Sequence, residues 1–354
     1  MTACVAYFRQ TRIWLMRKTP FAVAVLCFAL MASANSQDKA TVRPESNPKT
    51  PTSPNTARIE TLGTPPLLPT GEDEADFTIS KQVHEVNLFL SVTDEKGRFV
   101  SDLAADELKV LDNHKSPERL TYFQARTNLP LRVILAIDVS TSIRERLHFE
   151  QEAASAFLKH IMRTEMDEAA IVAFASTVQE KTQGMTNDVN ALDATIRTLQ
   201  AYGETAMYDA IVLSCRKLHG ARRTGVVRPI IILITDGVDT ASKETLQAAE
   251  ESATRVEAAI FALDASSIYE TDQKGRLVLE KLTHETGGIV LPARETGDLK
   301  GAFKTIEKIL RNQYALGYPP PGLEADGSFR PIEVASSRRG LRVHARHGYY
   351  APKK

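Results

Sequence analysis

The stretch that decides the fold is LRVILAIDVSTS, residues 131–142. Its first seven positions are almost continuously apolar, and three further runs share this character: AAIVAF at 169–174, PIIILI at 229–234 and AAIFAL at 258–263. Strands that are apolar on both faces are typical of a parallel sheet covered by helices on both sides. The four runs therefore predict the central strands of one such sheet.

Helical patterns lie between these runs, at about 144–163, 187–200, 205–219, 243–256, 275–286 and 297–311. Strands that alternate with helices in this way predict a doubly wound α/β domain with a mostly parallel sheet. We place this domain at residues 129–311.

The segments on either side have a different pattern. Residues 80–128 and 312–354 both contain short stretches in which apolar and polar positions alternate, as in VNLFLSV at 86–92 and YALGY at 314–318. Each segment is too short to bury a comfortable core by itself. We therefore expect the two to form one small β-sandwich interrupted by the α/β domain. The alternative is two independent β units.

Polar side chains follow the predicted strands. Asp138, Ser140 and Ser142 come directly after the first strand, Asp236 follows the isoleucine-rich strand, and Thr205 opens a helix between them. Ligands of open α/β sheets bind at the carboxyl ends of the strands, so these five side chains are expected to lie on one edge. Two carboxylates and three hydroxyls suit a hard divalent cation, and no His or Cys nearby favours zinc.

Each part of this set also has a simpler interpretation. Ser140 or Ser142 could cap the following helix through its hydroxyl, and Asp236-Gly237 could be an ordinary turn. Position favours the metal interpretation, because every element falls where a strand ends or a helix begins.

The region from about Leu129 to Leu310 resembles a von Willebrand factor type A domain. The segment Asp138-Val139-Ser140-Thr141-Ser142, with Thr205 and Asp236, matches the metal-ion-dependent adhesion site of that family in order and spacing. The resemblance implies Mg²⁺ or Mn²⁺ bound by the three hydroxyls, with the two aspartates contacting it directly or through water. It also implies that an acidic residue of a protein partner takes the remaining coordination position. The flanks and the tail GYYAP at 348–352 resemble a bacterial secreted subgroup of such proteins.

The amino-terminal region predicts export. Residues 1–34 hold four basic and no acidic side chains, a short apolar run and the small residues ASA at 32–34. This is the pattern of a secretory signal peptide cleaved after Ala34, although an uncleaved anchor and a true start at Met16 instead of Met1 remain open. Residues 35–79 are rich in proline and predict a flexible linker. We expect a periplasmic, secreted or cell-surface protein with no stable membrane span after cleavage.

Overall charge excludes some classes of function. The precursor has 44 basic and 44 acidic side chains, so it lacks the strong positive charge of a nucleic-acid binder. Of the three cysteines only Cys215 remains after cleavage. Because it lies in an apolar helical context, we predict an inert buried thiol.

Three functions are compatible with this site. The first is a non-enzymatic module that binds the acidic residue of a protein partner. The second is a metal-assisted hydrolase, for which Asp264 or Glu204 would have to act as general base. The third is a structural envelope protein whose metal only joins loops. Asp264 is more readily interpreted as a cap before Ser266, and Asp209 as a loop-holding hydrogen-bond acceptor. We therefore favour the binding module.

Overall fold

The computed structural model of the chain describes residues 85–125, 129–220, 226–266 and 273–353. The predicted signal peptide at 1–34 and linker at 35–79 lie outside these ranges. Among the described residues, none of the helices has the length and apolar character that a membrane span requires.

The α/β domain contains one six-stranded sheet in the order β6-β5-β4-β7-β8-β9. Its strands are β4 (Leu131–Asp138), β5 (Glu168–Phe174), β6 (Val178–Glu180), β7 (Arg228–Thr235), β8 (Ala259–Asp264) and β9 (Val290–Pro292). All neighbours run parallel except the edge strand β6, which is antiparallel to β5. The predicted mostly parallel α/β fold is confirmed, whereas β6 and β9 were not anticipated.

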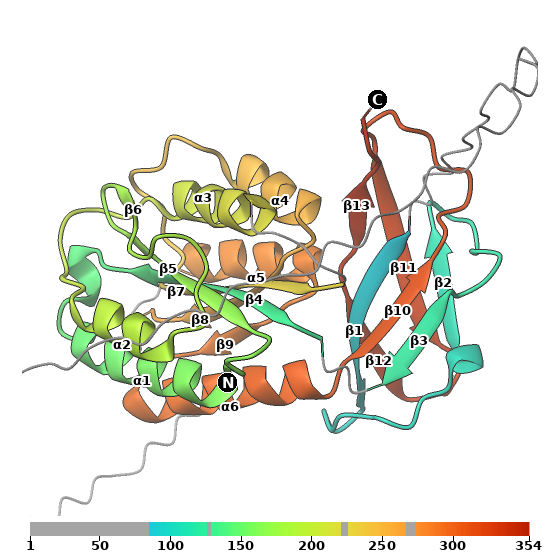
Figure 1. The fold of residues 1–354 in the computed structure, drawn as a ribbon, viewed down its shortest axis with the longest axis horizontal. Helices are drawn as coiled ribbons and strands as arrows, with labels where there is room; N and C mark the ends of the chain where they lie inside the picture. Colours follow the sequence, from blue (N-terminus) through green and yellow to red (C-terminus); the bar gives the residue numbers. More distant parts are fainter. Residues whose placement is uncertain (1–84, 126–128, 221–225, 267–272, 354) are drawn as a thin grey trace, which may run out of the picture. The chain divides into compact units, whose positions relative to one another are not determined.

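In the described part of the chain, six α-helices cover the two faces of this sheet (Figure 1). They are α1 (Leu147–Ile161), α2 (Val189–Arg197), α3 (Met207–Gly220), α4 (Leu246–Arg255), α5 (Lys274–Thr286) and α6 (Thr296–Arg311). Side chains of α1, α2 and α6 share one apolar core with Val133, Leu135 and Ile137 of β4. Ile134 and Ala136, on the other face of β4, share a second core with α3, α4 and α5. Both faces of β4 are therefore buried, which explains its unbroken apolar sequence.

The flanking segments form two antiparallel sheets. Their elements are β1 (Val86–Asp94), η1 (Ala105–Glu107), β2 (Leu108–Asp112), β3 (Tyr122–Ala125), β10 (Tyr314–Tyr318), β11 (Phe329–Ser336), β12 (Leu341–Ala345) and β13 (Gly348–Tyr350). The sheet orders are β12-β1-β10-β3 and β13-β11-β2. Strands from both ends of the chain occur in each sheet and share one apolar core. The interrupted β-sandwich is thus present, and the alternative of two independent β units is wrong.

A buried polar cluster joins the amino-terminal and carboxyl-terminal segments of the chain within the sheet β13-β11-β2. The fully buried carboxylate of Asp112 on β2 lies 2.7 Å from Nη2 of Arg330 on β11. The same carboxylate accepts a hydrogen bond of 2.9 Å from the hydroxyl of Tyr349 on β13. Charged hydrogen bonds in a dry site are strong, so this cluster ties β2 to strands more than two hundred residues later.

Candidate metal centre

Asp138 is the last residue of β4 and is fully buried. Its Oδ1 accepts the backbone N–H of Ser140 at 2.8 Å, and its Oδ2 accepts the hydroxyl of Thr235 at 2.7 Å. Burial raises the pKa of Asp138 to about 6, although the hydrogen bonds from Ser140 and Thr235 oppose this rise. The carboxylate is therefore fixed in orientation, and it is well placed to gain from a nearby cation.

The two serine hydroxyls lie side by side after β4. Oγ of Ser140 and Oγ of Ser142 are 2.9 Å apart. Ser140 precedes the short helix η2 (Thr141–Ile143) but its side chain makes no cap, and Arg146, not Ser142, occupies the cap position of α1. The helix-capping interpretation of these serines is therefore wrong.

Thr205 lies just before α3 and is held by the loop that follows β7. Its backbone N–H donates to the hydroxyl of Thr240 at 3.0 Å, and its carbonyl accepts the N–H groups of Thr240 and Ala241. The Thr205 side chain is buried, and within the described part of the chain its hydroxyl makes no hydrogen bond. A hydroxyl that is positioned but unpaired is free to bind an external group.

Asp236 is the first residue after β7 and is half-buried. One carboxylate oxygen accepts the N–H of Val238 at 2.9 Å, so the turn interpretation is also correct for this segment. Gly237 follows with φ +83°, where a Cβ atom would lie 2.4 Å from the carbonyl oxygen of Gly275 at the start of α5. Burial raises the pKa of Asp236, while the Val238 bond and the charge of Arg146 oppose this.

The structure joins the five predicted residues to different degrees. Asp138, Ser140 and Ser142 are linked directly, and Asp138 and Asp236 are close enough to repel each other electrostatically. Among the described residues no hydrogen bond joins Thr205 to the other four; its backbone groups bond to Thr240 and Ala241 in the loop after β7.

The donor set fits a hard, six-coordinate cation. The described residues contain no group of three or more His, Cys, Asp or Glu side chains that could hold a metal ion, so hydroxyls must supply part of any site here. Neighbouring oxygens around an octahedral Mg²⁺ ion lie about 3 Å apart, given metal–oxygen distances of about 2.1 Å. The Ser140 and Ser142 hydroxyls share a hydrogen bond of 2.9 Å, so they are already about as far apart as two such ligands would be.

Comparison with known families assigns the domain. The family described as von Willebrand factor type A domain matches residues 133–238, which include Asp138, Ser140, Ser142, Thr205 and Asp236. The chain contains a von Willebrand factor type A domain.

Several solved structures are similar to this chain. They include the PilB minor pilin from Streptococcus sanguinis, at 14% identity and a TM-score of 0.43 over 52% of this chain and 62% of the pilin. A von Willebrand factor type A protein from Catenulispora acidiphila matches at 13% identity and a TM-score of 0.44, over 75% of this chain and 74% of that protein. The pilus adhesin SpaC from Lactobacillus rhamnosus GG matches at 10% identity and 0.43, over 70% and 48%. This chain thus spans less than two thirds of the pilin. A comparison with curated proteins gave no match.

Two side chains that the sequence analysis did not consider support the site of the von Willebrand factor type A domain. Thr240 binds Thr205 as described, and Asp239 accepts the N–H groups of Met207 and Tyr208 at 2.8 and 3.2 Å. Asp239 therefore caps the amino end of α3 and fixes the position of the residue before it. In the sequence, the only signal for these roles of Asp239 and Thr240 is their position directly after Asp236-Gly237-Val238.

Glu150 was also overlooked. It lies in the first turn of α1, is 2% exposed, and neither of its carboxylate oxygens has a hydrogen-bond partner. Burial raises its pKa to about 7, Arg146 lowers it, and the charges of Asp138 and Asp236 raise it further. The domain therefore has a further acid, fully buried, within electrostatic range of the two site aspartates.

The remaining candidates have structural roles. Asp264 accepts the N–H of Ser266 at 3.0 Å and lies 3.4 Å from Nη2 of Arg294. Its carboxylate holds the turn after β8, and the predicted cap stays a prediction because the next described helix, α5, begins only at Lys274. Asp209 accepts the N–H groups of Lys243 and Glu244, so its predicted loop-holding role is confirmed. Cys215 is buried and its pKa is raised to about 12 by burial, as expected for an inert thiol.

Proposed function

We propose that this chain is an exported, non-enzymatic binding module that holds Mg²⁺ or Mn²⁺ and captures an acidic side chain of a partner protein. The residues that would hold the ion are Asp138, Ser140, Ser142, Thr205 and Asp236. The observation that carries the proposal is the pair of serine hydroxyls 2.9 Å apart beside a carboxylate fixed by two hydrogen bonds.

Two carboxylates balance the charge of a divalent cation, and neutral hydroxyls donate only weakly. A cation bound in this way would offer an electrophilic coordination position to an outside carboxylate oxygen. The chain's own contribution would be to hold Asp138, Ser140 and Ser142 in a fixed arrangement, with the Thr205 backbone anchored by Thr240, so that less ordering is needed on binding.

The surroundings of the site favour binding over hydrolysis. A hydrolase needs a base that is free to take a proton from water. Asp264, one of the two bases that the sequence suggested, already accepts a hydrogen bond from Ser266 and lies near Arg276 and Arg294. Glu204, the other, is an exposed side chain, so water surrounds it. Neither has the environment that prepares a general base.

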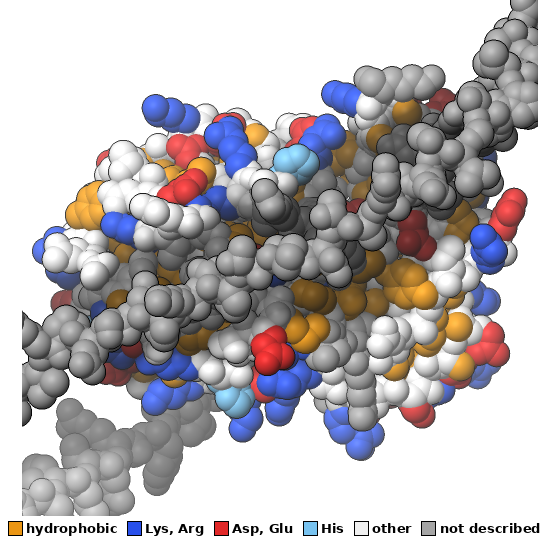
Figure 2. All heavy atoms as spheres, viewed as in Figure 1, with side chains coloured by type: hydrophobic (Ala, Val, Ile, Leu, Met, Phe, Trp, Pro, Cys, Tyr) orange, Lys and Arg blue, Asp and Glu red, His pale blue; other side chains and the backbone are white. Residues whose placement is uncertain are grey.

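A protein partner suits the surface charge better than a nucleic acid does. On the part of the face in Figure 2 that is not grey, basic and acidic side chains are interspersed. Residues 1–34 read as an export signal, so the partner would be a protein of the envelope or of the exterior.

Calorimetry tests the metal site. Mg²⁺ and Mn²⁺ should bind the processed protein, and Asp138→Ala or Asp236→Ala should abolish the binding heat. Asp188→Asn is a matched control, because Asp188 accepts amide bonds from Asn190 and Ala191 at the start of α2 and takes no part in the site. Metal affinity that survives both alanine variants would contradict the assignment.

A pull-down from envelope extract tests the partner. Capture should occur with Mg²⁺ and be lost both with EDTA and in Thr205→Ala. If metal raises the melting temperature of the protein but no metal-dependent partner is captured, the ion is structural and the binding function is wrong.

A further inference from the structure

Arg228 is a buried cation without a counter-charge. It is the first residue of β7, is 2% exposed, and its Nε and Nη1 atoms have no hydrogen-bond partner. Within the described part of the chain no carboxylate forms an ion pair with it. Its guanidinium carbon lies 5.5 Å from the ring centroid of Phe89 on β1, which stabilises only one face of the group.

Arg228 stays charged at neutral pH in spite of its burial. Burial lowers the pKa of Arg228 to about 9, so the side chain still carries a full positive charge at pH 7. A dry, unpaired charge is strongly unfavourable, and native proteins normally supply a partner for it. The described residues do not contain that partner.

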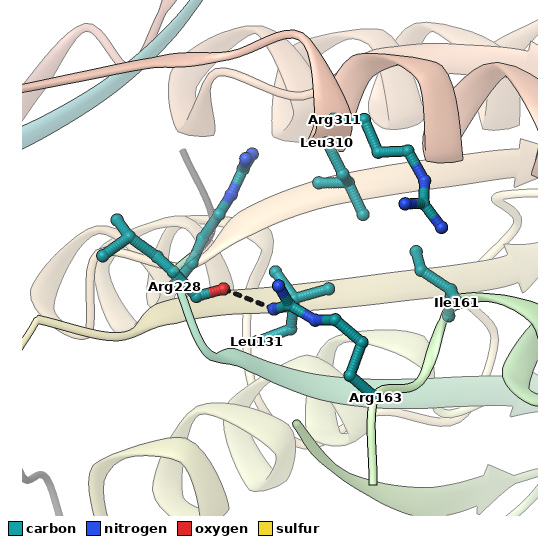
Figure 3. Close-up of a pocket in the computed structure, with 7 residues that line it drawn as sticks. Leu131, Ile161, Arg163, Arg228, Leu310 and Arg311 are labelled. Carbon is teal, nitrogen blue, oxygen red and sulfur yellow. Dashed lines mark hydrogen bonds between the residues drawn. The ribbon is translucent and has the colours of Figure 1, made fainter. Parts of the chain in front are cut away.

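A cavity of about 60 Å³ lies beside Arg228. Figure 3 shows that its walls come from separate elements: Arg228 from β7, Leu310 and Arg311 from the end of α6, Ile161 and Arg163 from the end of α1 and the residues after it, and Leu131 from β4. One water needs about 10–15 Å³ of such space. The cavity therefore has room for about four to six waters, or for one small ion together with some water.

The charges around this cavity do not cancel. Arg163 is paired with Asp167, with 2.7 Å between Nη2 and Oδ1. Arg311 is paired with Glu307, with 2.8 Å between Nε and Oε1. Three guanidinium groups thus face two carboxylates, and the uncompensated positive charge belongs to Arg228.

We propose that this cavity binds a small monovalent anion, of the size of chloride or formate, with Arg228 as its main ligand. One negative charge is what neutrality requires, and the cavity size selects against larger anions. Because Phe89 belongs to the sandwich and Arg228 to the α/β domain, the anion would stabilise the junction between them. This site is independent of the metal centre at the other end of β7.

Thermal unfolding in different salts tests the proposal. The processed protein is melted in sodium chloride, sodium formate and sodium gluconate at equal ionic strength, because gluconate is too large for the cavity. At an anion concentration ten times the dissociation constant, chloride or formate should raise the melting temperature by about 3–5 °C relative to gluconate. The chloride and formate arms show which anion is preferred.

Arg228→Met should abolish the difference between chloride and gluconate. Arg330→Met is the matched control: Arg330 is also buried, at 5% exposure, but it has its own carboxylate in Asp112. It should lower the melting temperature in all three salts and keep the difference between them. If Arg228→Met does not fold, Arg311→Gln is measured instead, and its anion response should require a higher anion concentration.

Equal melting temperatures in chloride and gluconate would overturn the proposal and leave only water in the cavity. A difference that persists unchanged in Arg228→Met would overturn it as well, because a general salt effect acts equally on every variant. Anomalous scattering from a bromide-soaked crystal gives the direct readout, with a peak expected beside the Arg228 guanidinium.

Discussion

Replacing Glu150 with glutamine should flatten the pH dependence of stability. The pKa of Glu150 rises from its ordinary 4.5 to about 7 in the folded protein, mainly through burial. Between these values the folded state binds more protons than the unfolded state. The stability that Glu150 contributes is therefore fully present below pH 4.5 and is lost as pH rises through 7. Each pH unit of that interval is worth about 1.4 kcal/mol. The loss therefore amounts to about 3 kcal/mol.

The assay is urea unfolding in EDTA at several pH values from 5 to 8. From the lower to the higher pH, wild-type stability should fall relative to Glu150→Gln by about 2–3 kcal/mol. Comparing the two proteins across pH cancels the constant cost of burying an amide. Glu152→Gln, whose side chain is 57% exposed on the same helix, should follow the wild-type profile. Parallel curves for wild type and Glu150→Gln would refute the argument that this acid is buried and unpaired.

Three further outcomes are expected. Gly237→Ala should destabilise the protein by about 2–4 kcal/mol, because the new Cβ would lie 2.4 Å from the Gly275 carbonyl oxygen in a backbone with φ +83°. Thermal unfolding measures this loss, and calorimetry with Mn²⁺ should show weaker binding. Asp112→Ala should cost about 3–5 kcal/mol in urea unfolding, since it leaves Arg330 buried without its partner; a loss below about 1 kcal/mol would contradict this. The processed protein should show no tryptophan emission, because Trp14 is the only tryptophan and lies in the predicted signal peptide; emission from exported material would refute cleavage after residue 34.

The central fold could be predicted because its information is local. Each of β4, β5, β7 and β8 is a continuous apolar run, and burial on both faces leaves that run unmistakable. The strands β6, β9 and β13 contain only three residues each, so they carry too little pattern to stand out. Their conformation is determined by the neighbour with which each one pairs.

The candidate site residues and their order could also be predicted from the sequence. The neighbouring residues that hold them in place could not. Asp138, Ser140 and Ser142 are close in sequence and adjoin a strand end, so their proximity follows from the fold. The bond from Thr205 to Thr240 joins residues 35 apart, and only tertiary structure brings them together. Glu150 is an intermediate case: it lies one helical turn after the buried Leu147, so its place on the apolar face of α1 was visible, whereas its lack of partners was not.

Glu150 and Arg228 are both buried charges without hydrogen-bond partners, yet their chemistry gives them different ways to avoid the cost. A carboxylic acid can bind a proton and become neutral, and so Glu150 needs no ion in metal-free protein at or below neutral pH. The Arg228 guanidinium, with its pKa lowered to about 9, keeps its proton throughout the range in which Glu150 titrates, so it needs a counter-ion or water there. Stability should therefore depend on pH through Glu150, near the candidate metal centre, and on the anion through Arg228, at the amino end of β7. A Glu150→Gln variant that keeps its chloride response, and an Arg228→Met variant that keeps its pH response, would separate the two effects.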